Sequence, residues 1–160
     1  MVSFSGTTSH TIDTKARLCL PQNRRDKLGD SFVLSWSNDF RTLAIFTNEA
    51  WEKRTELLLS VGSEWDGMAH EFKRTVLGMA FEDTRPDNQG RILIPSVARK
   101  QFGLCEGDEV LLVGAGTSLE IWNAKRFEER FDTAPDPRYE KLLDYMKANY
   151  FSVRVQSDGQ

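Results

Sequence analysis

The chain is poor in the residues that mark several classes of protein. It has two cysteines, two histidines and five prolines in 160 residues, too few cysteines for the disulfide framework of a small secreted domain. Cys19 and Cys105 lie between apolar neighbours and are expected to be small buried side chains in a reducing compartment. No run of about 18 uncharged apolar residues occurs, so no membrane-spanning helix is predicted. Without a basic, apolar start, no signal peptide is expected, and we predict a cytoplasmic protein.

The composition is that of a globular protein with a packed interior. Hydrophobic residues make up 39% of the chain, aromatic residues 11% and charged residues 28%, which excludes a disordered or collagenous chain. The formal net charge is -3. Total charge therefore gives no reason to expect a nucleic-acid partner, and any such argument has to be local.

An internal repeat organises the chain. Residues 13–29 match residues 87–103 at a constant offset of 74, with identity at five of 17 positions, whereas chance would supply about one. The identical pairs are Asp13/Asp87, Arg17/Arg91, Pro21/Pro95, Arg25/Arg99 and Gly29/Gly103. Residues 42–53 match residues 118–129 at an offset of 76. The sequence therefore contains a duplicated unit of roughly 50 residues.

Each unit has the pattern strand, polar turn, strand, short helix and hairpin. A proline opens each short helix and a glycine follows it, which are the residues that favour a helix start and a helix end. The predicted strands are 8–12, 17–20, 31–36 and 42–46 in the first unit and 80–84, 91–94, 109–113 and 118–122 in the second. The predicted helices are 21–28 and 95–102 in the units, with 48–61, 68–79 and 139–150 outside them.

These elements predict four segments along the chain. Residues 1–60 form the first unit with its following helix, and residues 61–78 a connecting helical segment. Residues 79–132 form the second unit, and residues 133–160 a C-terminal helix with a frayed tail.

Positive charge is concentrated in the two copies of the repeat. Residues 10–29 contain five bases and two acids, and residues 87–103 contain three bases and one acid. The two segments carry +3 and +2, so the remainder carries -8. This asymmetry indicates an anion-binding surface. The alternative is that the short helices simply have solvated basic faces.

The segments DTKARLCLP and DNQGRILIP resemble the paired DxxxR motifs of the MraZ family, whose members are two fused AbrB/SpoVT-type swapped-hairpin units. HTID, EAWEK, FKRTVLGMA and LEIWNAKRFE also match, and the resemblance covers about residues 1–132. It implies an α+β fold of tandem ββαββα units with a double-ψ or swapped-hairpin, β-barrel-like core and flanking helices. It also implies a nucleoid-associated transcriptional regulator that assembles into rings, binds short direct repeats in a promoter and represses its own division and cell-wall gene cluster.

One position departs from the family pattern. The residue before the motif arginine is usually glycine, as at Gly90, but the first motif has Ala16. Alanine with a positive φ costs roughly 1–2 kcal/mol. Either the first turn does not need that conformation or it has a different shape in this chain.

The motif residues have defined physical roles. Asp13 and Asp87 can accept backbone N–H groups at the start of a turn and orient the arginine four residues later. Arg17 and Arg91 then present a planar fork that suits phosphate oxygens or guanine O6 and N7. The alternative for both arginines is an internal salt bridge. The resemblance favours double-stranded DNA as the partner.

Two neighbouring turn residues are further candidates. Lys15 suits a phosphate group as a point charge. Gln89, at the equivalent place in the second turn, can read an adenine edge or simply be a polar turn residue.

Four bases on the short helices are candidate phosphate contacts: Arg24, Arg25, Arg99 and Lys100. Because Arg25 and Arg99 are repeated, they can equally pair inside the fold as framework residues.

No catalytic or metal-binding pattern emerges. The two histidines are isolated, no Cys/His spacing fits zinc, and Gly114–Gly116 lacks the third glycine of a nucleotide loop. We expect no enzyme activity, cofactor, small-molecule substrate or membrane partner. The alternative to a DNA-binding regulator is an oligomeric scaffold whose basic faces meet acidic protein surfaces.

Overall fold

The structure is a computed structural model that describes residues 2–131, 141, 144, 145 and 148. The chain divides into two compact units, Met1–Ala124 and Lys125–Gln160. Both β-sheets and the helices α1 to α4 belong to the first unit. The predicted helix at 139–150 falls almost wholly outside the described residues, and the predicted segment boundaries stay a prediction.

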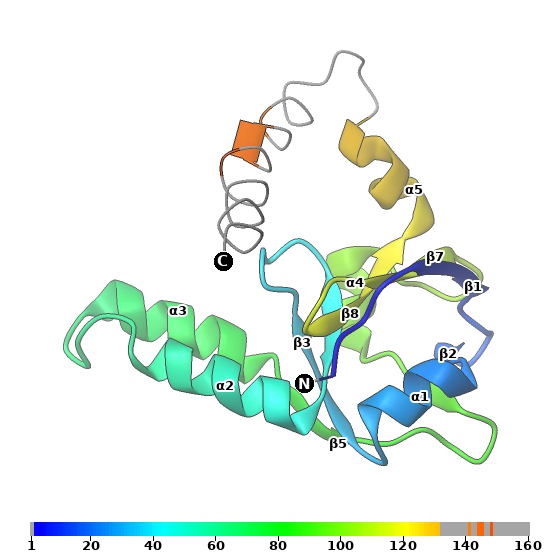
Figure 1. Cartoon of the computed structure of the whole chain (residues 1–160), viewed down its shortest axis with the longest axis horizontal. Helices are drawn as coiled ribbons and strands as arrows, with labels where there is room; N and C mark the ends of the chain where they lie inside the picture. The colour runs from blue at the N-terminus through cyan, green and yellow to red at the C-terminus, as the bar shows by residue number, and fades with distance from the viewer. Residues whose placement is uncertain (1, 132–140, 142–143, 146–147, 149–160) are drawn as a thin grey trace, which may run out of the picture. The chain divides into compact units, whose positions relative to one another are not determined.

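The order of elements confirms the duplicated pattern (Figure 1). The first copy comprises β1 (Thr7–Thr11), β2 (Arg17–Cys19), α1 (Gln22–Leu28), β3 (Phe32–Trp36), β4 (Leu43–Phe46) and α2 (Asn48–Leu59). After α3 (Gly67–Gly78), the second comprises β5 (Phe81–Thr84), β6 (Arg91–Leu93), α4 (Ser96–Phe102), β7 (Glu109–Gly114), β8 (Ser118–Asn123) and α5 (Ala124–Glu128). A 3₁₀ turn at Glu129–Phe131 follows.

The main sheet is antiparallel and is shared by the two copies. Its strand order is β1-β7-β8-β4-β3-β5, so the opening strand of each copy pairs with the hairpin of the other. Thr7 lies opposite Val113 and Thr11 opposite Glu109, while Phe32 lies opposite Thr84. This exchange confirms the α+β swapped-hairpin fold. No ladder joins β1 to β5 within the described residues, so a closed barrel is not seen.

A second, two-stranded sheet joins the copies at the end of the DxxxR turns. Strands β2 and β6 are antiparallel, with Leu18 opposite Ile92 and Cys19 opposite Arg91. Leu18 and Ile92 are fully buried. Two backbone bonds extend the pairing, from Leu20 N–H to the Gly90 carbonyl (2.8 Å) and from Ile94 N–H to the Ala16 carbonyl (2.9 Å). The residue that follows each strand is therefore hydrogen-bonded to the turn of the other copy.

The larger of two hydrophobic clusters lies between the sheets and the short helices. The two copies contribute equivalent residues, including Leu18, Leu20, Leu28, Leu34, Leu43 and Ile45 from the first and Ile92, Ile94, Phe102, Leu112, Leu119 and Ile121 from the second. Because both copies are needed to complete this core, neither is expected to fold alone.

Helices α2 and α3 contact each other and extend from the sheet (Figure 1). The Thr47 hydroxyl caps α2 and the Asp66 carboxylate caps α3. Trp51 and Val76 are buried, which fixes the base of this helical pair on the sheet. Several large apolar side chains further along the pair are exposed: Leu57, Leu59, Val61, Trp65 and Met68.

The prediction that the cysteines are buried is wrong. Cys19 and Cys105 are both free and exposed. Side chains alternate along a strand, so in β2 the burial of Leu18 turns Arg17 and Cys19 to the opposite, outer side. The apolar neighbours of Cys19 suggested a buried run, but only every second residue points inward.

The second unit contains most of α5 and the 3₁₀ turn. The Arg130 guanidinium lies 3.3 Å from the centre of the Phe127 ring and donates a hydrogen bond to the Phe127 carbonyl. Across the described part of the chain, no helix is both long and apolar enough to cross a membrane.

Candidate nucleic-acid interface

The first DxxxR turn is organised by one carboxylate. Asp13 Oδ1 accepts the backbone N–H groups of Lys15 (2.8 Å) and Arg17 (2.9 Å), and its Oδ2 accepts the Arg17 Nε–H at 2.9 Å. The aspartate thus holds both the turn and the direction of the guanidinium. This is the orienting role that the spacing predicts.

The second turn repeats this arrangement closely. Asp87 Oδ1 accepts the backbone N–H groups of Gln89 (2.9 Å) and Arg91 (3.0 Å), and Oδ2 accepts the Arg91 Nε–H at 2.8 Å. In each turn only Nε of the arginine is engaged by the aspartate. The Nη groups of each arginine are not bound by the aspartate of the same turn, although Arg17 Nη1 forms a longer ion pair with Asp87 of the other turn.

The hydrogen bonds keep both aspartates ionised. Partial desolvation raises the pKa of Asp13, but the Arg17 and Lys15 N–H groups and the Arg17 guanidinium together hold that pKa below its ordinary value. The Arg91 N–H group is the main cause that lowers the pKa of Asp87. At neutral pH the aspartates are therefore fixed acceptors.

The two turns lie next to each other. Arg17 Nη1 is 4.0 Å from Asp87 Oδ2, across the β2–β6 pairing. The side chains of Arg17 and Arg91 are 26% and 27% exposed, and those of Lys15 and Gln89 are exposed. The structure thus brings together all six turn residues that the sequence singled out.

The first turn uses the left-handed conformation despite its alanine. Ala16 has φ 60° and Gly90 has φ 79°, so the two turns have the same backbone shape. Both alternatives considered for Ala16 are therefore wrong, because the first turn does adopt the left-handed conformation and does not have a different shape. The Ala16 methyl is 1% exposed, and its packing offsets part of the strain.

Two residues on the outer side of β2 and β6 were missed. Arg17, Cys19, Arg91 and Leu93 share one surface, which we call the ribbon face. Leu93 is 62% exposed, and the Cys19 thiol donates to the Gln89 carbonyl at 3.6 Å. Strict two-residue alternation from Arg17 and Arg91 would have placed both residues there.

The four helix bases have different environments. Arg24 is 5% exposed, and its guanidinium donates to the carbonyls of Ser5 (2.8 Å) and Gly6 (3.2 Å). The prediction that Arg24 contacts phosphate is therefore corrected, because its side chain supports the N-terminal segment instead. Lys100 is exposed.

The repeated pair Arg25 and Arg99 also differs between copies. Arg25 Nε donates to the Leu20 carbonyl at 3.0 Å. Arg99 Nη1 forms an ion pair with Glu106 Oε1 at 2.9 Å. Both side chains remain partly exposed, so equal residues in the two copies have unequal partners.

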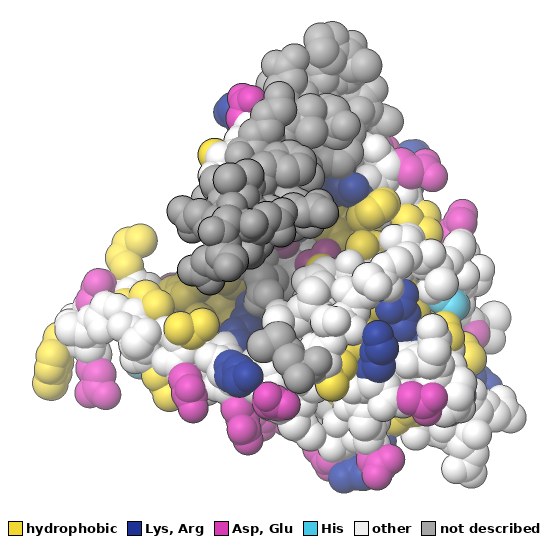
Figure 2. Space-filling view, viewed as in Figure 1, with side chains coloured by type: hydrophobic (Ala, Val, Ile, Leu, Met, Phe, Trp, Pro, Cys, Tyr) yellow, Lys and Arg dark blue, Asp and Glu magenta, His cyan; other side chains and the backbone are white. Residues whose placement is uncertain are grey.

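Charges of both signs lie on the face of the molecule in Figure 2. Basic and acidic side chains both occur there, and no single basic patch covers that face. The ordered turns, rather than total charge, therefore set any preference for an anion.

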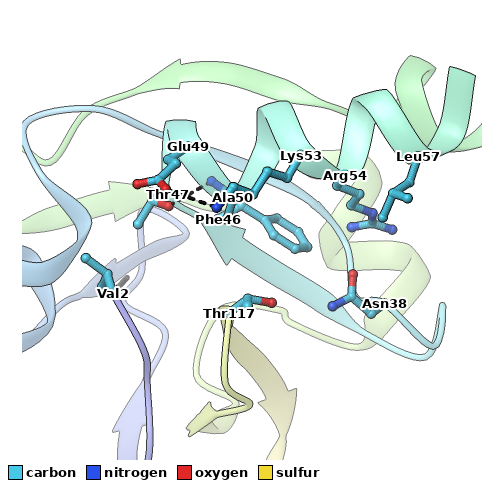
Figure 3. A pocket seen from close by; sticks show the side chains of 10 residues that line it. All are labelled: Val2, Asn38, Phe46, Thr47, Glu49, Ala50, Lys53, Arg54, Leu57 and Thr117. Atoms are coloured by element: carbon cyan, nitrogen blue, oxygen red, sulfur yellow. Dashed lines mark hydrogen bonds and ion pairs between the residues drawn. The ribbon is translucent and has the colours of Figure 1, made fainter.

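A pocket of about 300 Å³ lies elsewhere, beside the start of α2 (Figure 3). Arg54 lines it, but the Arg54 guanidinium donates to the Trp36 and Ser37 carbonyls. Burial lowers the pKa of Arg54 to about 10. This arginine is a structural support of the β3–β4 connection. Within the described ranges, no cluster of three or more His, Cys, Asp or Glu residues is placed to hold a metal ion.

The duplicated swapped hairpins with one DxxxR turn in each copy define a class of tandem two-unit proteins. The family model described as "MraZ protein, putative antitoxin-like" matches residues 3–66 and 79–142. The chain belongs to the MraZ family.

Relatives of similar length support this assignment. "Transcriptional regulator MraZ" of Oenococcus oeni is 37% identical over 129 residues, covering 79% of this chain and 85% of the relative. The protein of the same name from Cutibacterium acnes is 35% identical over 126 residues, with 79% and 85% covered. That of Heliobacterium modesticaldum is 34% identical over 146 residues, with 89% and 98% covered.

Proposed function

We propose that this chain is a sequence-specific DNA-binding transcriptional regulator that reads DNA through its two DxxxR turns. The observation that carries the proposal is the adjacency of two arginines, each held by its own aspartate and each with its Nη edge unbound by that aspartate. Such preordered forks lose little side-chain freedom on binding phosphate or a guanine edge. The names of the relatives support the same function.

The ribbon face suits the width of a DNA groove. A two-stranded β-ribbon fits the major groove of B-form DNA, and here the ribbon carries Arg17 and Arg91 on its outer side. Lys15 and Gln89 extend from the flanking turns. In this proposal Lys15 contacts phosphate, while Gln89 and the two arginines read base edges or hold the backbone.

The protein acts as a ring-shaped homo-oligomer on short direct repeats in the promoter of its own division and cell-wall gene cluster, and represses it. Repetition of a weak contact explains how a chain with a net charge of -3 holds DNA, since linked sites gain effective concentration. Exposed apolar side chains on the α2–α3 pair support self-association. Such a regulator works in the cytoplasm at the nucleoid.

The test is fluorescence-anisotropy binding to the chain's own upstream region, titrated with salt beside a scrambled duplex. We expect sequence-preferring binding that weakens with salt. The double variant Arg17→Ala/Arg91→Ala should lose at least roughly tenfold in affinity, with a salt slope lower by about 2 per bound unit.

The matched control is Lys53→Ala/Arg74→Ala. It also removes two positive charges, but from exposed ion pairs on α2 and α3, and should leave affinity and slope unchanged. Equal binding to both duplexes would refute sequence-specific recognition and favour the protein-interaction scaffold.

Cys19 provides a chemical test of the ribbon face. We expect maleimide labelling of the variant Cys105→Ser, which retains only Cys19, to block DNA binding, because the adduct occupies the surface between Arg17 and Arg91. The labelled variant Cys19→Ser, which retains Cys105, should bind normally. Mass spectrometry confirms labelling, and undiminished binding by the Cys19 adduct would exclude the ribbon face from the interface.

A further inference from the structure

Arg25 belongs to the first copy but lies against the turn of the second. It projects from α1, and its Nε–H donates to the Leu20 carbonyl at 3.0 Å. The N–H group of Leu20 in turn donates to the Gly90 carbonyl at 2.8 Å. Arg25 is therefore hydrogen-bonded to the residue that follows β2 and that is itself bonded to the Asp87–Arg91 turn.

The approach of Arg25 to this turn depends on Gly90. A Cβ atom at position 90 would lie 2.7 Å from both Cζ and Nε of Arg25 and 3.0 Å from its Nη2. The guanidinium thus packs directly on the backbone between Gln89 and Arg91. No other residue type leaves room for it in this position.

The guanidinium charge of Arg25 is not balanced locally. Within the described residues no carboxylate forms an ion pair with Arg25, and its only hydrogen bond runs from Nε to Leu20. Its side chain is partly exposed. The Nη groups are therefore donors at the turn that already holds Arg91.

The equivalent position in the other copy differs both in the pairing of its arginine and in the space at the facing turn. Nη1 of Arg99 is paired with Glu106 at 2.9 Å, and the turn that Arg99 would approach by symmetry has Ala16 instead of glycine. The first turn therefore has neither the space nor the uncompensated charge that the second turn has.

We propose that Arg25 is a DNA-phosphate ligand that the first copy supplies to the second turn, so that the two turns hold the DNA backbone unequally. A guanidinium fixed at Nε presents its outer edge to phosphate oxygens in a set direction. Arg25 and Arg91 together bind one stretch of the DNA backbone, whereas Arg17 has no equivalent second arginine beside it. This inference rests on the proposed function.

Salt titrations of DNA binding test the role of Arg25. Arg25→Ala and Arg25→Gln should each lower the salt slope by about 1 per bound unit, with equal loss on the upstream and scrambled duplexes, because a phosphate carries no sequence information. Glutamine keeps a donor for the Leu20 carbonyl, so a lower slope in Arg25→Gln would result from the lost charge rather than from the lost hydrogen bond. Arg25→Lys should restore the slope.

Arg99→Ala is the matched control and should leave the slope unchanged, because Glu106 already occupies Nη1 of Arg99, whereas Asp87 binds Arg91 through Nε. A slope of wild-type size in folded Arg25→Gln would overturn the inference. The proposed function fails separately, if the wild type shows no salt-dependent, sequence-preferring binding or if Arg91→Ala changes nothing. Circular dichroism at the assay temperature confirms that each variant is folded.

Discussion

Replacing Arg24 with alanine should destabilise the fold by about 2–4 kcal/mol, the largest stability effect expected among the basic residues of the repeat. Arg24 is 5% exposed and donates to the carbonyls of Ser5 and Gly6, the two residues that precede β1. The Gly6 carbonyl also accepts from Gly114 N–H, but Ser5 would lose its charged donor. Urea unfolding followed by tryptophan fluorescence measures the loss.

Lys27→Ala is the control from the same helix. Lys27 is exposed, although its amino group also donates to a backbone carbonyl, that of Ser3 at 3.0 Å. Its removal should cost less than about 0.5 kcal/mol. Arg24→Lys keeps the charge without the planar fork and should fall between wild type and alanine. Equal midpoints for Arg24→Ala and Lys27→Ala would show that the buried guanidinium contributes nothing.

Arg24 acts inside the fold rather than on DNA. Its charge also reaches a neighbouring histidine: burial lowers the pKa of His10, and the Arg24 charge lowers that pKa further. We expect Arg24→Ala to leave the salt slope of DNA binding unchanged under conditions where the variant is folded. The two arginines of α1 thus have different surroundings, with Arg24 bound to the Ser5 and Gly6 carbonyls and Arg25 packed on the neighbouring turn.

Local sequence signals were sufficient for most elements. Pro21 and Pro95 precede α1 and α4, and Gly29 and Gly103 follow them with φ 86° and 65°. The repeat itself predicted that the two DxxxR turns share one design. These features depend on residues close in sequence, whose conformational preferences are strong.

Long-range pairing and side-chain direction were harder to predict. Periodicity identifies β1 as a strand but does not show that it pairs with β7 rather than with a strand of its own copy. That exchange came from the family resemblance. The burial of Arg24 also depends on tertiary neighbours, since the local sequence does not distinguish it from Arg25. The exposure of Cys19, by contrast, follows from two-residue alternation once Arg17 is placed on the outer side of β2.

Only part of the difference between the two DxxxR turns could be predicted from the sequence. Ala16 against Gly90 was apparent in the sequence, but its consequence lay in residues distant along the chain. Gly90 admits Arg25, 65 positions away, whereas Arg99 pairs with Glu106. Duplicated sequence therefore produced turns with equal backbones and unequal surroundings.

Replacing Gly90 with alanine should destabilise the fold by about 2 kcal/mol and weaken DNA binding by roughly tenfold. The backbone there has φ 79°, which alanine adopts at a cost. The new methyl would also lie 2.7 Å from the Arg25 guanidinium carbon and displace it, breaking the bond to Leu20. Urea unfolding and anisotropy at several salt concentrations measure the two effects.

Ala16→Gly is the reciprocal control and should change stability by less than about 1 kcal/mol. Relief of the strained φ is offset by the lost buried methyl and by the greater freedom of glycine in the unfolded chain. If the space at Gly90 serves Arg25, then Arg25→Ala in the Gly90→Ala background should weaken DNA binding no further. Additive losses would show that Gly90 acts on DNA binding through the turn itself rather than by admitting Arg25.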